Sequence, residues 1–574
     1  MNWQNYCAVR LFLDFDTFPL VHTTLSFLLC GGVLVWLLAF PRGQRGWFVA
    51  VALAVFFFLR LPSIAYNRQI NPDESQMITQ GKTLAVDPVY FRSVDGTTIG
   101  PLDSYALIVP SWIGLPFDYT SARLLGFLLI AASLLFLYKT ARHWFGERPA
   151  QLALLPIMFT LGLTRNGDLL SYCSELVPLF LLSAGTWLFS RMDTRQRAAY
   201  GTVFLTGLLL GLIPLGKLQG APLAAVLGLV VSVSVLRQPI VWKQKLTQLG
   251  LLGLGTLIFP VAFIGMAWAN GLYDDFWLFY IEGNLRYGGN TNHWQNILNF
   301  SRHLIKGQEF GWLVMFSVLL LIMAVGRYVS MPQRPALSEA WVTRLGFISL
   351  SVLAAVYTVT RTGTEFIHYF FFMVGPLFLL LALAWKIISL PNESPAFRLL
   401  PVLASVLFLT VIVGKGASNY VRGVPPNFYP QNKLALLTPQ PPVVQQIRKY
   451  ADEGEPLVVW GWRCDYYVSA KMRQGTAENH SERCVFQSPM TSVYQHRYLR
   501  DFYRSFPPVF VDAVGSENMW LNDRRTQGHE IIKPLCAFVK AHYRYMGMAN
   551  DARIYVRLDR VKGLPRAETR FAHN

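Results

Sequence analysis

Two adjacent acids, Asp73 and Glu74, could do chemistry in the stretch Ile70-Asn71-Pro72-Asp73-Glu74-Ser75. They follow a hydrophobic segment of membrane length, and a charge there costs free energy unless it is solvated or used. A carboxylate in such a place can act as a general base that removes a proton from a hydroxyl nucleophile. The simpler interpretation is that Asn71-Pro72 starts a helix, because Pro in a first turn followed by acids is a common helix start. The two interpretations are compatible.

More polar and aromatic side chains lie in the connectors on the same side of the hydrophobic runs. Carboxylates and imidazoles could hold a divalent cation, and Lys and Arg could neutralise a phosphate or pyrophosphate leaving group. Together these groups suit transfer of a group from a lipid-anchored phosphate donor at a bilayer surface. Besides the acid pair, the candidate set is Lys82, Asp103, Asp168, Glu175, Lys217, Gln219, Arg286, His293, Arg361, His368 and Tyr369.

Each of these residues also has a purely structural interpretation. Lys217 joins two hydrophobic runs and could extend its ammonium to the interface. Arg361 and Glu365 are spaced for an i,i+4 ion pair, and His368 could pack in a core. We therefore base the functional hypothesis on the acid pair.

The elements that must position these residues are hydrophobic runs. Of the 574 residues 53% are hydrophobic and 15% are charged, whereas soluble domains carry about 25% charged residues. The apolar residues gather in runs of membrane length, which predicts a polytopic α-helical membrane protein with about twelve spans. The runs are 18–40, 47–65, 119–138, 150–164, 175–190, 201–216, 218–236, 247–269, 310–326, 343–360, 366–387 and 399–414.

Charge in the connectors predicts the orientation. One alternate set is basic and poor in acids, which places it in the cytoplasm by the positive-inside rule. The acid-rich set then lies outside, as do both termini; it comprises 66–118, 165–174, the turn at Lys217, 270–309 and 361–365. The net charge of +18 is spread over short loops, so we expect no nucleic acid partner. The expected location is a plasma membrane, such as the inner membrane of a bacterium.

Three parts of the chain follow from this orientation. Residues 1–17 form a short extracytoplasmic segment, 18–414 a transmembrane domain, and 415–574 an extracytoplasmic α/β domain. Within the first large outer loop, 66–118, two juxtamembrane helices are predicted, near 74–86 and 105–114. In the last part, strands near 456–461, 508–512 and 552–558 alternate with helices near 494–505 and 530–542. Cys464 and Cys484 could pair there.

Several short motifs resemble patterns of the GT-C membrane glycosyltransferases. Asn71-Pro72-Asp73-Glu74-Ser75 is similar to the acid signature in their first outer loop, closest to the branch of protein mannosyltransferases and the lipid A aminoarabinose transferase. The resemblance covers roughly residues 45–390, but an extra span, 18–40, precedes the family's usual first helix. Further similar motifs, in the family's order, are Gly100-Pro101-Leu102, Arg123-Leu124-Leu125-Gly126, Ser174-Glu175, Gly216-Lys217-Leu218-Gln219 and His368-Tyr369-Phe370-Phe371.

The resemblance implies an inverting glycosyltransferase with a polyprenyl-phosphate sugar donor and an extracytoplasmic glycan, lipid or protein acceptor. By matching position, the resemblance makes Asp73 the catalytic base and Glu74 its neighbour. It makes Lys217, together with Arg361 or His368, the candidate for binding the donor phosphate. We add Tyr369, Arg286 and Lys82 to the candidates for binding the donor phosphate. The candidates for the acceptor side and the remainder of the pocket are Asp103, Asp168, Glu175, Gln219 and His293. Some members use a metal, so a divalent cation (Mg²⁺, Mn²⁺ or Ca²⁺) on Asp73, Glu175 and His293 is a further hypothesis.

Two other classes of protein remain as alternatives. A membrane transporter or lipid-handling protein would have inverted repeats, helices broken by Gly or Pro, and polar residues at mid-membrane. A scaffolding protein would act through the part at 430–574 and not through Asp73.

Overall fold

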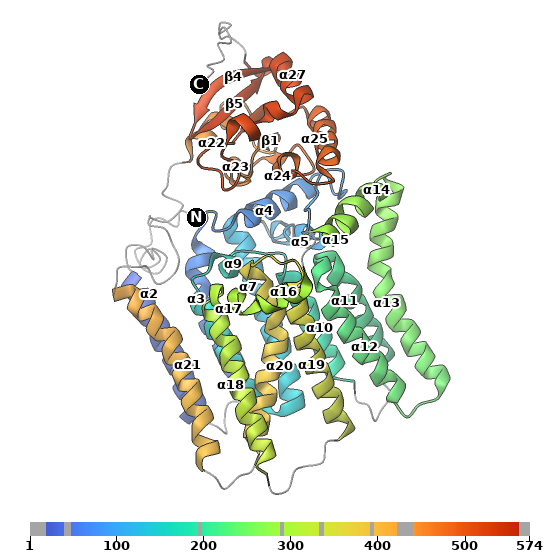
Figure 1. The fold of residues 1–574 in the computed structure, drawn as a ribbon, viewed down its shortest axis with the longest axis vertical. Coiled ribbons are helices and arrows are strands. Elements are labelled where there is room, and N and C mark those ends of the chain that lie inside the picture. The colour runs from blue at the N-terminus through green and yellow to red at the C-terminus, as the bar shows by residue number, and fades with distance from the viewer. Residues whose placement is uncertain are drawn as a thin grey trace.

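The structure, a computed structural model, describes residues 19–39, 47–192, 198–287, 292–331, 338–390, 395–421 and 440–561. Its long helices run side by side in a bundle, and a smaller C-terminal domain with a β-sheet covers one end of that bundle (Figure 1). The short helices of the acid-rich connectors lie at this covered end. The predicted segment 1–17 lies outside the described residues.

A helix lies at each of the twelve hydrophobic runs. Among the described residues, seven helices are long and apolar enough to cross a membrane, and four further apolar helices are shorter. The chain is therefore an integral membrane protein, while the count of twelve spans stays a prediction. The helices at the runs are α2 (Pro19–Ala39), α3 (Trp47–Ala65), α7 (Tyr119–Phe145), α8 (Glu147–Leu163), α10 (Leu176–Ser190), α11 (Tyr200–Gly216), α12 (Ala221–Arg237), α13 (Trp242–Ala269), α18 (Glu309–Val329), α19 (Glu339–Thr360), α20 (Phe371–Ile388) and α21 (Pro395–Val421).

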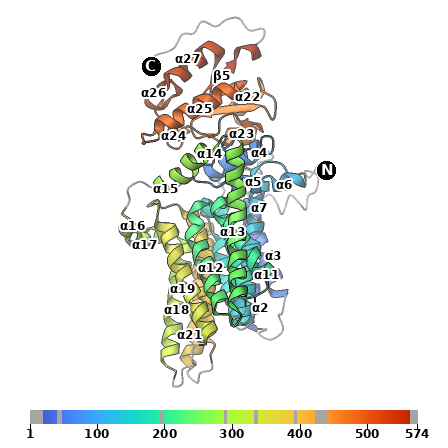
Figure 2. The same ribbon diagram turned by 90° about the vertical axis from the view of Figure 1, so that its right-hand side faces the viewer.

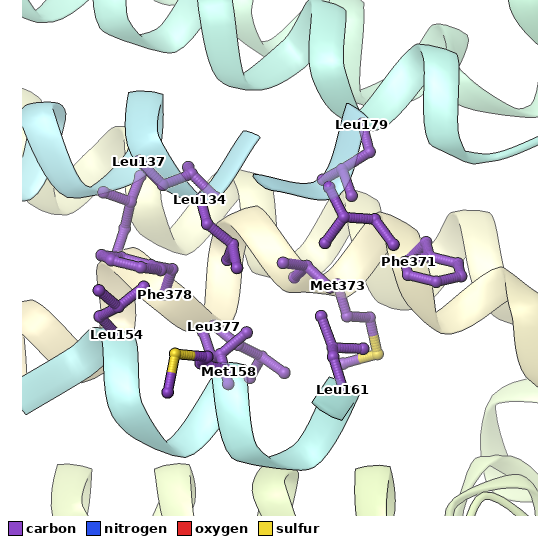
Figure 3. Close-up of a cluster of buried hydrophobic side chains, with 14 of the residues drawn as sticks. Leu134, Leu137, Leu154, Met158, Leu161, Leu179, Phe371, Met373, Leu377 and Phe378 are labelled. Atoms are coloured by element: carbon purple, nitrogen blue, oxygen red, sulfur yellow. The ribbon is translucent and has the colours of Figure 1, made fainter. Parts of the chain in front are cut away.

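Helix α20 lies at the centre of the bundle. In its apolar span 78% of the residues are buried, against 11% in α13. Figure 3 shows Phe371, Met373 and Phe378 of α20 packed among Leu and Met side chains of α7, α8 and α10. Close packing of this kind holds helices together in lipid, where exclusion of water contributes little. It also fixes the short helix η4 (Ile367–Phe370), which leads into α20 at the covered end.

Helix α13 stands at the edge of the bundle, at the right in Figure 1 and at the front in Figure 2, and packs mainly on α11. Gly207 and Gly211 of α11 form a G-x-x-x-G motif, which lets two helix backbones approach closely. A Cβ atom at Gly211 would lie 2.2 Å from the carbonyl oxygen of Thr256 in α13. The motif therefore explains how an otherwise lipid-exposed helix stays attached.

The acid-rich loop after α3 folds into α4 (Pro72–Leu84), α5 (Pro101–Ala106) and α6 (Val109–Trp112). The amide of Gly100 donates to the carbonyl of Gly216, at 2.8 Å. A Cβ atom at Gly100 would lie 2.0 Å from that same oxygen, so only glycine fits there. This contact ties the loop to the end of α11, one residue before Lys217. The other short elements of this end are α9 (Gly167–Leu170), α14 (Tyr273–Asp275), η3 (Phe276–Glu282), α15 (Gly283–Arg286), α16 (His293–Leu298) and α17 (Phe300–Lys306).

The C-terminal domain contains a mixed five-stranded sheet in the order β2-β1-β3-β5-β4. The strands are β1 (Pro456–Trp460), β2 (Arg473–Gln474), β3 (Val509–Asp512), β4 (Tyr543–Ala549) and β5 (Ala552–Arg557). Strand β1 is parallel to β2 and β3, and β5 is antiparallel to β3 and β4. The helices include α22 (Pro442–Arg448), α23 (Asp465–Ala470), α24 (Glu482–Val485), α25 (Thr491–Ser505) and α27 (Lys533–His542). The predicted α/β class of this domain is confirmed.

Cys464 and Cys484, whose pairing the sequence left open, are both free and buried thiols. Cys464 belongs to the apolar core that includes α22 and α23, and Cys484 to a different core. Two separate cores hold the side chains apart.

The second of these cores joins the two domains. It combines Tyr90 and Phe91 of the loop after α4 with Trp460 and Tyr494 of the C-terminal domain. At its edge lies a buried ion triad, in which Arg497 is 2.6 Å from Asp95 and 2.9 Å from Glu478. A buried cation between two acids is stable only with such close partners. The C-terminal domain is thereby fixed over the covered end.

Candidate functional site

A cavity of about 570 Å³ lies between the bundle and the C-terminal domain. Its floor belongs to the bundle and its roof to the C-terminal domain, and we use these two names below. Polar and aromatic floor residues are Asn71, Asp73, Gln76, Thr97, Thr98, Asp168, Ser174, Lys217, Arg286, Tyr287, Phe366, His368 and Tyr369. Those of the roof include Trp462, His480, Glu482, Arg483, Phe486, Tyr494 and Trp520.

Asp73 lies in the first turn of α4. The Asn71 side chain accepts a hydrogen bond from the Asp73 amide at 2.8 Å, so Asn71-Pro72 does start the helix. Within the described part of the chain, the Asp73 carboxylate has no hydrogen bond and no ion pair. Burial raises the pKa of Asp73, although the positive charges of His368 and Lys217 act in the opposite direction. The result is an unpaired, more basic carboxylate at the cavity.

Glu74 points away from the cavity and is fully buried. Its carboxylate accepts two hydrogen bonds from Arg123, at 2.9 and 2.5 Å, and one from the amide of Tyr172 at 2.9 Å. Arg123 also donates to the carbonyls of Ser63, Tyr66 and Arg68. This network fixes α4 against α7 and so holds Asp73 in place.

Lys217 is the buried cation of the floor. Its ammonium forms an ion pair with Glu175 and donates to the hydroxyl of Ser174 at 2.8 Å. It also lies 4.9 Å from the centre of the Tyr369 ring. Burial alone would lower the pKa of Lys217, but the Glu175 carboxylate more than offsets this and raises it. Lys217 is therefore positively charged at neutral pH.

His368 connects the two acids beside Lys217. Its Nδ1 is 3.4 Å from Asp168, and its Nε2 is 3.9 Å from Glu175. Asp168 also accepts from Asn71 at 2.7 Å and from the Ile367 amide at 3.1 Å. Burial acts to raise the pKa of Asp168, but the hydrogen bond from His368 and its other donors lower it. A continuous polar network thus runs from Asn71 to Lys217.

Arg286 is the exposed cation of the same cavity. It forms an i,i+4 ion pair with Glu282, and 54% of its side chain is exposed. An exposed pair of this kind is worth little, so Arg286 can leave Glu282 for another anion. The structure therefore brings together Asp73, Asp168, Lys217, Arg286, His368 and Tyr369 of the predicted set.

Other predicted residues lie away from the cavity. Lys82 donates to the carbonyl of Lys471 at the domain interface. Burial lowers the pKa of Lys82 to about 8. The Gln219 amide donates to the carbonyl of Thr358 at 2.6 Å. Both side chains have structural partners instead of facing the cavity.

Asp103 and Arg361 also lie outside the cavity lining. Asp103 is completely buried without a hydrogen-bond partner for either oxygen among the described residues. Burial and the nearby Glu175 raise the pKa of Asp103 well above its ordinary value. Arg361 ends α19. His293 begins α16, and its side chain is outside what the structure describes.

Two of the three predicted metal ligands, Asp73 and Glu175, do not fit a divalent cation as a pair. Glu175 is already paired with Lys217, and Asp73 is near the same ammonium and His368. Among the described residues, one group has metal-binding dimensions: Asp512, His529 and Glu530 in the C-terminal domain. There the Arg553 guanidinium pairs with Asp512 and lies 2.6 Å from Glu530, where a cation would have to bind. The mixture of charges at the cavity fits a phosphate better.

Arg123 and the roof residues were not predicted as functional. Arg123 was noticed only as part of a motif, although an Arg in the first turn of a span after an acid-rich loop indicates a buried partner. The roof residues carry no local signal. The roof residues lie at the cavity because their domain is held there by contacts between residues far apart in the chain. In one of these contacts, the side-chain amide of Asn479 donates to the carbonyl of Gln76, 403 residues away.

No protein-family model and no curated protein sequence matches the chain. The structure is similar to the crystal structure of ArnT from Cupriavidus metallidurans bound to undecaprenyl phosphate. The TM-score is 0.55 at 13% sequence identity, and the match covers 91% of this chain and 100% of ArnT. A lower similarity, with a TM-score of 0.41 and 13% identity, relates it to the oligosaccharyltransferase of Archaeoglobus fulgidus, over 90% of this chain and 74% of that one.

The similarity to ArnT concerns the fold. It extends over the helical bundle and the C-terminal domain together, because nearly all of both chains is covered. The fold expected from the short motifs, that of the branch with the aminoarabinose transferase, is thus confirmed: the chain has the fold of ArnT.

Proposed function

We propose that the protein is a glycosyltransferase that moves a sugar from a polyprenyl-phosphate donor to an acceptor hydroxyl. The observation that carries the proposal is the unpaired Asp73 carboxylate, which shares one cavity with Lys217 and His368 at the end of a membrane bundle. The fold supports it, because ArnT, whose structure contains undecaprenyl phosphate, has the same architecture.

Asp73 acts as the general base of the reaction. Its carboxylate takes the proton from the acceptor hydroxyl while the acceptor oxygen attacks the anomeric carbon of the donor sugar. The bond between that carbon and the phosphate oxygen breaks, and its electron pair leaves with the polyprenyl phosphate. A single displacement of this kind inverts the configuration at the sugar. The raised pKa of Asp73 suits the role, because a more basic carboxylate is a better proton acceptor.

Lys217, His368 and Arg286 hold the leaving phosphate. Lys217 is buried and charged, so it can stabilise negative charge that develops on the phosphate oxygen. Arg286 exchanges its partner Glu282 for the phosphate at the mouth of the cavity. Tyr369 fixes the Lys217 ammonium from one side. Glu74 is a positioning residue in this scheme, as it acts through α4.

The covered end is the extracytoplasmic face in this proposal, which agrees with the acid-rich connectors found there. The prenyl chain of the donor remains in the bilayer, and the acceptor arrives from the side of the C-terminal domain. A transporter would instead require its polar site near mid-membrane. The polar cavity lies at the end of the bundle, under a roof, which favours the transferase.

Replacing Asp73 with Asn tests the base. The purified protein is incubated with a panel of undecaprenyl-phosphate hexoses and pentoses, and release of undecaprenyl phosphate is measured. Loss of a general base lowers turnover by roughly 10²- to 10⁴-fold, and we expect this range for Asp73→Asn.

Asp274→Asn is the matched control, because Asp274 is exposed and does not line the cavity. We expect this variant to keep normal turnover. Near-normal turnover by a folded Asp73→Asn protein would rule out Asp73 as the base.

A further inference from the structure

The roof of the cavity presents a cluster of aromatic rings. Trp462 stacks on His480 with their ring centres 4.5 Å apart, and Trp520 meets Trp462 edge to face at 4.9 Å. Trp520 is 37% exposed and Met519 beside it is 62% exposed. The roof therefore offers apolar surface, rigidly held, that nothing in the described chain covers.

Polar groups in this cluster lack partners. His480 is buried, lines the cavity and makes no hydrogen bond among the described residues. The indole N–H of Trp462 is likewise buried without a partner there. Burial lowers the pKa of His480 to about 3, so the ring is neutral and has both a donor and an acceptor nitrogen. Unpaired buried donors are costly, which indicates that a ligand or water completes this part of the site.

Glu482 adds a free carboxylate to the roof. It is half-buried at the start of α24, lines the cavity, and has no hydrogen bond or ion pair in the described part of the chain. Burial raises the pKa of Glu482, although the charge of Arg483 acts in the opposite direction. Glu482 and Asp73 line the same cavity, one from the roof and one from the floor. Two free carboxylates, one from each domain, thus share one space.

We propose that this roof binds a carbohydrate as the acceptor, with a sugar ring against Trp520 and Trp462 and a sugar hydroxyl donating to Glu482. This inference rests on the proposed function, because only a transferase needs an acceptor. A pyranose ring has apolar C–H faces that pack on an aromatic ring, and a rim of hydroxyls that both donate and accept. A neighbouring hydroxyl of the same molecule then faces Asp73 from above.

Other acceptors fit the roof less well. A phosphorylated ligand would need free cations, but Arg483, the cation of this wall, already donates to the hydroxyl of Tyr494 at 2.7 Å and lies 4.0 Å from Glu478. A peptide bound in extended form would need an unpaired strand edge. The roof segments at the cavity are the loops around Trp462 and Trp520, the residues before and within α24, and the turn after it.

The test measures binding of simple glycosides to the full-length protein in detergent. The probes are the methyl glycosides of glucose, galactose, mannose and N-acetylglucosamine, and binding is followed by saturation-transfer difference NMR and by tryptophan fluorescence. We expect saturable binding of at least one probe to the wild type, with the strongest transfer to ring C–H protons. Trp520→Ala and Glu482→Gln should each weaken it by roughly tenfold.

Trp242→Phe is the control, since Trp242 is exposed on α13 and does not line the cavity. Glu482→Gln preserves the shape of a half-buried side chain, so it remains informative if Trp520→Ala unfolds. Binding that both roof variants weaken and the control keeps supports the inference. Absence of saturable binding to the wild type, or equal binding by Glu482→Gln and a folded Trp520→Ala, would overturn it.

Consumption of undecaprenyl-phosphate sugars by the wild type, measured in parallel, separates this inference from the proposed function. If the donors are consumed and no glycoside binds, the carbohydrate acceptor is wrong and the transferase stands. If glycosides bind and no donor is consumed, the proposed function fails, and the assignment of the sugar as an acceptor fails with it.

Discussion

Replacing Glu74 with Gln tests the buried pair with Arg123. The substitution keeps the size of the side chain and removes its charge, while Arg123 keeps its three backbone carbonyl partners. Both side chains are completely buried in the native state. Removing one partner of a buried ion pair costs about 3–5 kcal/mol, because the other charge is left uncompensated. We expect that loss in the free energy of unfolding.

Such a loss is large enough to measure on the detergent-solubilised protein. It lowers the ratio of folded to unfolded protein by roughly 10²- to 10⁴-fold. Thermal and denaturant unfolding, followed by tryptophan fluorescence, would report it as a shift of the transition. Glu453→Gln is the control, since Glu453 is 52% exposed and its pairs with Arg448 and Lys471 lie at the surface. We expect no measurable shift for that variant.

A double variant checks the physical cause. Replacing both Glu74 and Arg123 with Met removes the two charges together, so it should destabilise less than the sum of the two single changes. An unfolding free energy of Glu74→Gln within about 1 kcal/mol of the wild type would refute the reasoning.

Three more predictions follow from the geometry. Turnover should fall on acidification with a midpoint above the ordinary Asp pKa of about 3.9, because the base must be deprotonated and burial raises the pKa of Asp73. A pH profile of kcat/KM measures the midpoint, and a flat profile down to pH 4 would contradict the prediction. Gly211→Leu should destabilise the protein by about 1–3 kcal/mol, because the larger side chain separates α11 from α13. The control Gly253→Ala should not destabilise the protein, since no atom lies within 4 Å of a Cβ at that position. Thermal unfolding compares the two variants. Arg497→Met removes the close cation between two buried acids and leaves Asp95 without an ion pair among the described residues, so the C-terminal domain should become sensitive to limited proteolysis. Unchanged resistance would refute the role of Arg497 in docking.

Much of the helical bundle was predictable from the sequence, because each run of apolar residues is continuous and local. The strands β1, β3 and β5 were also visible as short apolar runs. Strand β2 was missed because it has two residues, and β4 because Tyr543–Ala549 follows a helix directly and contains a bulge near Gly547. Local patterns cannot reveal elements that exist only through their neighbours.

The candidate site was predictable in its floor and not in its roof. Asp73, Lys217 and His368 lie at the ends of different helices on one side, so placing the helix ends also placed them together. Which acid faces the cavity depended on Arg123, whose pairing with Glu74 spans 49 residues and leaves no periodic trace. The roof depended on contacts between residues about 400 apart, which pattern and composition do not encode.

The shared core of the two domains has a consequence for biogenesis. The segment that closes the cavity is synthesised long after Asp73, because the whole helical bundle lies between them in the sequence. Until that segment docks, the part of the shared core outside the C-terminal domain lacks contacts such as that of Phe279 with Tyr494, and its exposed apolar surface attracts chaperones and proteases. The cavity also lacks its cover against water during that interval. Catalytic competence and resistance to degradation therefore arise in the same late step, and a chain cut short before α22 is recognisable to quality control as unfinished.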